Sequence, residues 1–463
     1  MSIFSSLQIG KLALRAQYKG MEVSGKNVAN ANTPGYSRQR VNLVAVVPGI
    51  SPGVNLAPGR GVKVAGVERI HSEFYRTQLM NTASHLSYWI MRQETYRGVE
   101  VIFMEPGEYG LNQYLGDFFD AWSELSSSAE STAIRTGLLE RAETFTRAVQ
   151  DTYLRLTELR FDLRDEIGSR VQQVNQLAKE IAVINDKILF SHALKQTSNE
   201  LLDQLDLALE ELSGLIDIRV FRKENGAVDV FAGGSLLVQN QNTYAFDVEM
   251  ALDGTVHIVN HHGTAVEPQS GRLFGLLQGV NETIPEIQAQ IDQLVSSLVE
   301  EVNRLHRGGY NLYNETGINF FKEIEDNGVP PSLQFALNEE LAGDPSRIAA
   351  ASEGGQPGNG LQALEISRLR SAPVMNEGKV SMIDYYRGLV ASIGVKGQES
   401  TRMVEAFTKA ETQLREEHLA VAGVSLDEEV MNMIQFQHAW HAAARFISYV
   451  DYMIGTLIDE LGR

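Results

Sequence analysis

Hydrophobic positions near the N-terminus repeat with helical spacing. They recur every seven residues, at Leu7, Leu14, Met21 and Val28. This N-terminal seam predicts one amphipathic helix. The helix should end near Pro34 and Gly35, because a residue that precedes proline is pushed out of the helical region and glycine permits a positive φ. An extended arm rich in glycine and proline is expected to follow.

A second helical pattern fills the stretch between Leu138 and Ser213, which contains no proline and one glycine, Gly168. Its apolar positions follow two heptad seams, interrupted by Arg160 and Arg170. The pattern predicts a long helix in a coiled-coil or bundle setting. At 1.5 Å per residue, the part from 149 to 188 would be about 60 Å long, so the domain should be elongated.

From Ile216 the pattern changes to short alternating apolar runs. Asn225-Gly226, Gly233-Gly234 and Asp253-Gly254 separate these runs. Such dipeptides favour the tight turns of β-hairpins, and a small antiparallel domain is predicted. Helical spacing returns between Ile287 and Leu305, so the chain should leave the helical part, form β structure and come back.

The C-terminal region predicts two helices, at roughly 396–421 and 426–461, with a break at Gly423. Ser425 and Glu428 have the spacing of a capping box, and acids in the first turn suit the helix dipole, so we expect helix capping there rather than acid–base catalysis. The last helix carries a C-terminal seam of apolar residues. These are Leu426, Val430, Met433, Trp440, Ile447, Ile454, Ile458 and Leu461.

Together these patterns predict an α+β multidomain protein. An elongated helical bundle or coiled-coil core would be built from both the N- and C-terminal parts of the chain, with a small antiparallel β domain inserted in the middle. The expected segments are an N-terminal helix, an arm, a long helical core, a β-rich domain, a return helix, a loop and strand segment associated with the β domain, a helical segment and a C-terminal helix. They span residues 1–34, 35–70, 71–213, 214–270, 271–309, 310–345, 346–421 and 422–463.

Composition excludes several classes of function. The 463 residues include 40 Lys and Arg against 59 Asp and Glu, a net charge of −19, which argues against a nucleic-acid partner. No apolar run reaches the ~20 residues of a membrane-spanning helix, so no membrane insertion is expected. The absence of cysteine rules out disulfides and thiol chemistry. Lys11, Arg15 and Lys19 interrupt the first apolar stretch, which is unlike a cleaved secretion signal.

A search for catalytic and metal-binding patterns finds incomplete matches. The stretch from Gly20 to Asn27 has the glycines and lysine of a phosphate-binding loop, but Asn27 replaces the Ser or Thr and the stretch lies within the predicted helix. His257, His261 and His262, and separately His438 and His441, lack the further ligands of a metal site. We expect no catalytic residue, cofactor or metal, and we therefore expect that the protein is not an enzyme.

The sequence NVANANTPGYSRQ after the first helix resembles the N-terminal signature of bacterial flagellar axial proteins. The residues that carry it are Asn27, Asn30, Asn32, Thr33, Pro34, Gly35 and Tyr36. Five further stretches, at 174–188, 199–212, 226–238, 302–321 and 422–429, resemble the first hook-associated proteins, which form the junction between hook and filament. The chain departs from the family pattern at Ser72, where relatives carry an acid, and at Leu205, where they carry an arginine, so the sequence does not predict the ion pairs of these positions.

The resemblance implies a structural subunit of the extracellular flagellum. Family members leave the cell through the flagellar type III export machinery without a cleaved signal, and a dedicated chaperone shields the C-terminal helix. The implied partners are further copies of the chain in a tubular assembly, the hook protein, the second junction protein, the chaperone and the export machinery. The apolar seams of the terminal helices would lie at subunit interfaces, because the seams have too little partner surface if the middle of the chain folds by itself.

Two alternatives are compatible with the same patterns. One is another flagellar axial protein, either the hook protein or the second junction protein, which shares the terminal helices. The other is a non-flagellar coiled-coil adaptor. The long core helix and the C-terminal capping segment favour the first hook-associated proteins over other axial proteins, and the arm motif disfavours the adaptor.

Overall fold

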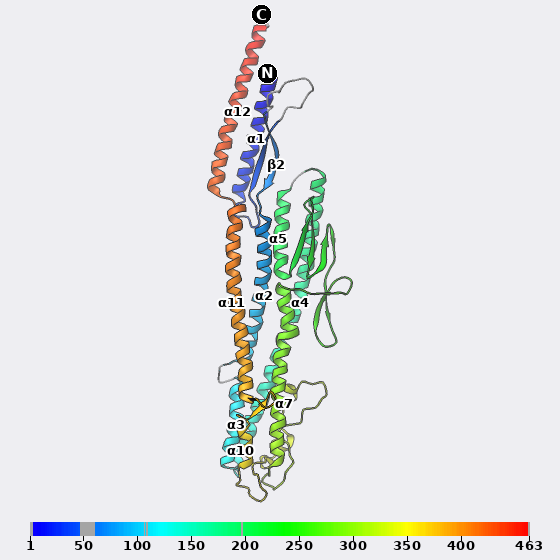
Figure 1. Cartoon of the computed structure of the whole chain (residues 1–463), viewed down its shortest axis with the longest axis vertical. Coiled ribbons are helices and arrows are strands. Elements are labelled where there is room, and N and C mark those ends of the chain that lie inside the picture. Colours follow the sequence, from blue (N-terminus) through cyan, green and yellow to red (C-terminus); the bar gives the residue numbers. More distant parts are fainter. Residues whose placement is uncertain (1–2, 47–60, 106, 108–109, 196–197, 462–463) are drawn as a thin grey trace.

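The computed structural model describes residues 3–46, 61–105, 107, 110–195 and 198–461, except for the side chain of residue 461. The molecule is elongated, and the N- and C-terminal helices lie together at one end (Figure 1). Within the described residues, none of the helices is both long enough and apolar enough to span a membrane.

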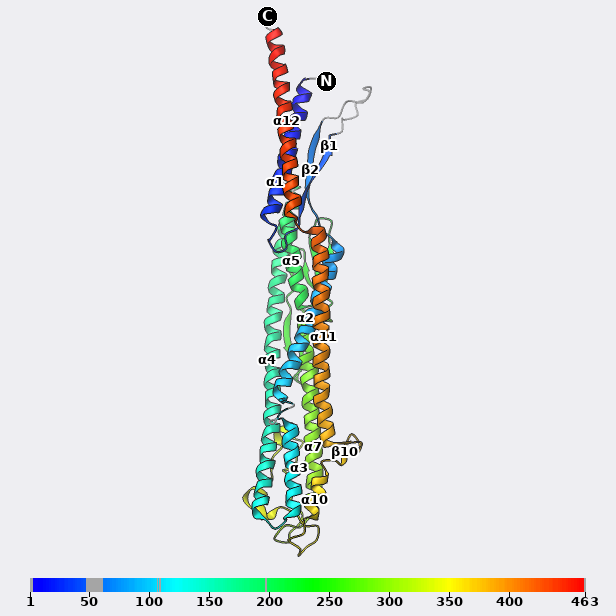
Figure 2. The same ribbon diagram turned by 90° about the vertical axis from the view of Figure 1, so that its left-hand side faces the viewer.

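Four long helices run side by side and form the rod of the molecule (Figures 1 and 2). They are α2 (Glu73–Phe103), α4 (Thr132–Ala193), α7 (Ile284–Gly308) and α11 (Met382–Ala422). Shorter helices complete the bundle, with α3 and α10 at the end distant from the termini. These are α3 (Leu111–Ser127), α5 (Asn199–Leu215), α6 (Arg272–Gln278), α8 (Pro331–Gln334), α9 (Glu339–Gly343) and α10 (Leu361–Arg368), together with a π-helical turn at Gly279–Thr283 and a 3₁₀ turn at Pro345–Arg347.

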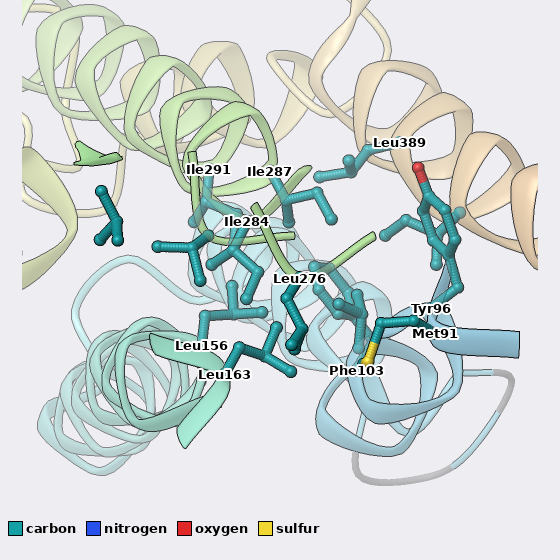
Figure 3. Packing of buried hydrophobic residues seen from close by; sticks show 14 of the residues in the cluster. Met91, Tyr96, Phe103, Leu156, Leu163, Leu276, Ile284, Ile287, Ile291 and Leu389 are labelled. Carbon is teal, nitrogen blue, oxygen red and sulfur yellow. The ribbon is translucent and has the colours of Figure 1, made fainter. Parts of the chain in front are cut away.

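The predicted heptad in the middle of the chain is confirmed as the inner face of α4. Its apolar seam positions, among them Leu156, Leu163 and Ile181, are buried. The helix packs on α2, α5, α6 and α7, and Figure 3 shows Leu156 and Leu163 next to Leu276 of α6. The helix ends at Ala193, and the rest of the predicted helical stretch forms the separate helix α5.

Arg160, which interrupts the apolar seam of α4, ties the helix to the β region. Its Nε donates to the carbonyl of Val280 at 2.8 Å, and its Nη2 donates to the carbonyl of Gly254 at 3.1 Å. Gly254 lies in the predicted Asp-Gly turn and has a φ of +80°. At this seam position, hydrogen bonds to the backbone of the π-helical turn and of the Asp253-Gly254 turn therefore replace an apolar contact.

The predicted β region forms two small antiparallel sheets. One has the order β3-β4-β5-β6 and the other β7-β8-β9. The strands are β3 (Ile218–Arg222), β4 (Val228–Ala232), β5 (Ser235–Gln239), β6 (Asn242–Thr243), β7 (Asp247–Met250), β8 (Val256–Val259) and β9 (Ala265–Val266). Two further hairpins pair β1 (Gln39–Ala45) with β2 (Val62–Arg69), and β10 (Pro373–Met375) with β11 (Val380–Ser381).

Two asparagines of α4 hold the β region against the rod. Asn185, which is fully buried, accepts from the N–H of Val228 at 2.9 Å and donates to the carbonyls of Val228 and Asn240. Asn175 makes the same pair of bonds with the backbone of Phe246, at 2.8 and 2.9 Å. The side-chain amides satisfy backbone groups that would otherwise be buried without a partner.

Residues 310–345, which we expected to associate with the β domain, contribute to the end of the rod distant from the termini. Phe320, Phe321 and Phe335 are fully buried there. Phe320 and Phe321 pack on Phe118 of α3, with ring centroids 5.9 and 5.6 Å away. The same cluster contains Trp122, whose ring centroid lies 5.0 Å from that of Phe320. This aromatic core closes the far end of the bundle.

Candidate functional site

The helices α1 (Ile3–Ala29) and α12 (Leu426–Leu461) lie side by side beyond the end of the rod (Figures 1 and 2). Two glycines of α1 permit their close approach. A Cβ atom at Gly10 would lie 2.6 Å from Cγ1 of Ile447, and one at Gly20 would lie 2.6 Å from the ring of Phe436. The contact between the two helices therefore depends on residues that lack a side chain.

The N-terminal seam lies at the edge of this contact. Leu7, Leu14, Met21 and Val28 are all half-buried. The most buried positions of α1, except for Val23, are small or polar, and the hydrophobic pattern did not reveal them. They are Gly10, Ala16, Gly20, Val23, Ser24 and Asn27.

The C-terminal seam divides between two environments. Met433, Trp440, Ile447 and Ile454 are half-buried, on the side of α12 that carries the contacts with α1. Leu426, Val430 and Ile458 are exposed. The side chain of Leu461 lies outside the described residues. α1 and α12 thus supply part of each other's partner surface, but the seam residues between them are only half-buried. That the seams lie at subunit interfaces stays a prediction.

A broad apolar surface of α12 faces away from α1. Tyr449 and Tyr452 are 71% and 74% exposed, and Met431, Ile434 and Met453 are also exposed. On α1, Phe4 and Tyr18 are exposed in the same way. We call the exposed α12 residues just named, which include Tyr449 and Tyr452, the outer face. Contiguous exposed apolar surface of this kind typically marks an interaction site.

The arm motif forms a turn around one buried side chain. Asn27 is fully buried, and its amide both donates to the carbonyl of Gln39 at 2.8 Å and accepts from the N–H of Gln39 at 3.0 Å. The hydroxyl of Tyr36 donates to the same amide oxygen at 2.8 Å. Gly35 has a φ of +76°, which explains the glycine. The motif thus fixes the start of the arm, at Tyr36 and Gln39, against the end of α1.

The other motif residues lie at the surface of this turn. Asn30 donates to the carbonyl of Lys26 at 3.0 Å and accepts from the hydroxyl of Thr33 at 3.3 Å. Asn32 and Pro34 are exposed. The exposed positions are available to contact another molecule, whereas Asn27 has a role in the fold.

Arg38 joins the arm to both C-terminal helices. Its N–H donates to the carbonyl of Ala422 at the end of α11, at 2.9 Å. Its guanidinium donates to Glu429 at 2.7 Å and, through both Nη atoms, to Glu428 at 2.7 and 3.0 Å. Hydrogen bonding to Arg38 lowers the pKa of Glu428. We call these contacts the joint.

The predicted capping box at Ser425 and Glu428 is present only in part. The Ser425 hydroxyl accepts from the N–H of Glu428 at 3.5 Å, a long contact. The carboxylate of Glu428 binds Arg38, a residue 390 positions away in the sequence. The acids of the first turn therefore serve an ion pair as well as the helix dipole, which the local spacing did not reveal.

A cluster of arginines and aspartates lies below the joint, where the arm meets the rod. Arg69 binds Asp203 at 3.0 Å and Asp206 at 2.6 Å, while Arg76 and Arg222 also bind Asp206. Burial opposes ionisation of Asp206, yet the three arginines together hold its pKa below the ordinary value. The ion pairs form although the sequence departs from the family pattern nearby, at Ser72 and Leu205.

Those two departures have structural explanations. The Ser72 hydroxyl accepts from the N–H of Tyr75 and caps the N-terminus of α2. Leu205 is fully buried in the core. Serine is a favoured N-cap residue, and leucine adds apolar area, so both replacements contribute to stability without a charge.

A cavity of about 700 Å³ lies at the joint, between the arm, the upper end of the rod and the end of α11. Pro34, Arg76, Leu207 and His418 are among its lining residues. No group of three or more His, Asp or Glu side chains that could hold a metal ion occurs among the residues that the structure describes. The histidines singled out from the sequence, at 257, 261, 262, 438 and 441, are all exposed.

Comparisons with known proteins agree with this architecture. Residues 96–321 match the model of the flagellar hook-associated protein FlgK helical domain, and residues 415–460 match that of the flagellar basal body rod FlgEFG protein C-terminal region. Flagellar hook-associated protein 1 of Bacillus subtilis is 28% identical, over 100% of this chain and 99% of the relative. The Escherichia coli protein of the same name is 23% identical, over 96% of this chain and 98% of the relative.

A solved structure shows the same fold. It is the flagellar hook junction protein FlgK from Burkholderia pseudomallei, with a TM-score of 0.65 and 15% identity, and it covers 74% of this chain and 100% of that chain. The relatives match the present chain from end to end, and the matched models include both the helical body and the C-terminal helix. The chain therefore belongs to the family of flagellar hook-associated protein 1.

Proposed function

We propose that the chain is a structural subunit of the bacterial flagellum, located at the junction between hook and filament, where its terminal helices join neighbouring subunits. The observation that carries this proposal is the outer face of α12. An exposed apolar surface is costly in a monomer and is typical of a surface that becomes buried in an assembly. The relatives that match the whole chain carry the name of a hook-associated protein.

The shape of the molecule supports an assembly through one end. The α1–α12 pair projects beyond the rod together with the β1–β2 hairpin, while the sheets formed by β3 to β9 lie along the side of the rod (Figure 1). Copies placed side by side could bring their helix pairs together and leave the β sheets at the periphery. A tubular arrangement of this kind gives each copy the same interface with the next one.

The family membership extends the proposal to partners and export. We infer that further copies of the chain, the hook protein and the second junction protein bind it in the flagellum. We also infer that the chain reaches the cell exterior through the flagellar type III machinery, without a cleaved signal, and that an export chaperone covers the C-terminal helix beforehand. The role is structural and needs no cofactor, metal or nucleic acid.

A double substitution on the outer face, Tyr449→Asp with Tyr452→Asp, tests the proposed interface. Two charges there would have to be desolvated on assembly, so we expect the variant to fold but to build no filaments. Filaments are counted by electron microscopy in cells whose own copy of the gene has been deleted, and thermal unfolding checks that the purified variant is folded.

Leu252→Asp is the matched control, because Leu252 is fully exposed in the β7–β8 turn and far from the helix pair. We expect normal filaments with this control. Normal filaments with the folded Tyr449→Asp and Tyr452→Asp variant would show that the outer face is not the assembly surface.

A further inference from the structure

The chain breaks between α11 and α12, and one arm residue contacts both sides of the break. Gly423, directly after α11, has an extended backbone. Arg38 binds the last residue of α11 through its N–H, and Glu428 and Glu429 of α12 through its guanidinium. Its carbonyl accepts from the N–H of Ile70, which links the same residue to the end of β2.

The backbone around Arg38 is held on both sides. The N–H of Ser37 donates to the carboxylate of Asp203 on α5 at 3.3 Å, and Gln39 is held by the buried amide of Asn27. A side chain that projects from such a fixed segment can act as a reference point for whatever it binds. The backbone from which the Arg38 guanidinium projects is therefore held by groups outside α12.

The two carboxylates that bind Arg38 differ in exposure, and this difference restricts the orientation of α12. The side chain of Glu429 is 2% exposed, while that of Glu428 is 51% exposed. A buried carboxylate that loses its cation is strongly unfavourable, because water cannot replace the partner. Only an orientation of α12 that keeps Glu429 against Arg38 avoids this cost. The bidentate contact with Glu428 further restricts rotation of α12 about its axis, because the planar guanidinium has fixed donor directions.

We infer that Arg38 is a positioning residue that sets the direction of α12, and with it the α1–α12 pair, relative to the rod. Since α1 and α12 pack on each other, a change in the direction of α12 also acts on α1, which Asn27 holds to the arm. The inference concerns the geometry of the single chain and does not rest on the proposed function.

Spin-label distances on the purified full-length protein test this inference. The chain contains no cysteine, so Gln413→Cys on α11 and Gln435→Cys on α12, both exposed, give two defined labels. We expect one narrow distance distribution with Arg38 present. With Arg38→Ala we expect loss of that narrow peak, because the pair samples several directions.

Graded variants separate positioning from general destabilisation. Glu429→Gln should broaden the distribution more than Glu428→Gln, because Glu429 is buried, and Arg38→Lys should restore it only in part. Arg40→Ala, which removes an exposed arginine two residues away, should leave it unchanged. Thermal unfolding of the Arg38→Ala variant checks that the rod stays folded. An unchanged narrow peak in Arg38→Ala, or an equal broadening in Arg40→Ala, would overturn the inference.

Discussion

Replacing Gly20 by leucine should separate α12 from α1 while the rod stays folded. A Cβ at this position would lie 2.6, 2.7 and 2.8 Å from three ring atoms of Phe436, which is closer than nonbonded carbon atoms approach. A ring cannot yield as the tip of a flexible chain does, so the helices must move apart. Overpacking of this kind costs about 1–3 kcal/mol. We expect hydrogen exchange to become fast in residues 3–29 and 426–461 and to stay slow in α4.

Gly25→Ala provides the control within the same helix. A Cβ built at Gly25 would have no described atom within 4 Å apart from its chain neighbours and the backbone of its own helix. Alanine favours a helix over glycine by about 1 kcal/mol, so α1 should exchange as slowly as before or more slowly. Fast exchange in both variants would mean that any substitution in α1 loosens the pair. Slow exchange in Gly20→Leu would show that the close contact at Phe436 does not hold the helices together.

Acid should weaken the far end of the rod through His306. This side chain is fully buried, and burial lowers its pKa from 6.5 to about 4. Its Nδ1 lies 2.7 Å from the carbonyl oxygen of Ile318, and its Nε2 accepts from the N–H of Ala349 at 2.9 Å. The geometry requires the neutral ring with its proton on Nδ1, because a protonated Nε2 would face another donor.

The sign of the effect follows from the lowered pKa in the folded state. The stabilising contribution is fully present above pH 6.5 and is lost as the pH falls toward 4, because the unfolded chain binds the proton first. The total is about 3 kcal/mol, from the fall of the pKa from 6.5 to about 4 on folding, since a tenfold change in proton affinity corresponds to about 1.4 kcal/mol. Urea unfolding followed by tryptophan fluorescence at several pH values measures it. Trp122 reports on this region, since its ring centroid lies 6.1 Å from that of His306.

His306→Gln is the matched variant for this measurement. The amide is neutral at every pH, so the variant should be less stable than the native chain at pH 7 and should lose less stability between pH 6.5 and 4.5. Other carboxylates and histidines contribute equally to both proteins. If the two proteins lost the same stability over this pH range, His306 would not be the group responsible.

The sequence predicted those elements whose pattern is local. The seam from 149 to 188 is the inner face of α4, and turn dipeptides such as Asn225-Gly226 separate the strands as expected. The family membership that the arm motif indicated is confirmed. The segment boundaries and the interface residues remain predictions.

Features that depend on distant partners were missed. The helix α11 begins at Met382, capped by Ser381, whereas we expected its start near 396. Gly388, Gly394 and Gly397 obscured the periodicity, although tertiary packing overrides the low helix propensity of glycine. The sequence analysis also missed Gly10 and Gly20 of α1, because a hydrophobic pattern is read from apolar side chains and glycine has none. The pairing of Arg38 with Glu428 joins segments 390 residues apart, and one-dimensional spacing contains no sign of it.

Deletion of the gene from the bacterium that encodes the chain, followed by electron microscopy and an assay of the medium for flagellin, addresses the proposed role in the flagellum. We expect hooks without filaments, with flagellin released into the medium, and restoration of filaments when the gene is supplied again. Normal filaments on the deletion strain would contradict the proposal that this chain forms the junction on which the filament is built.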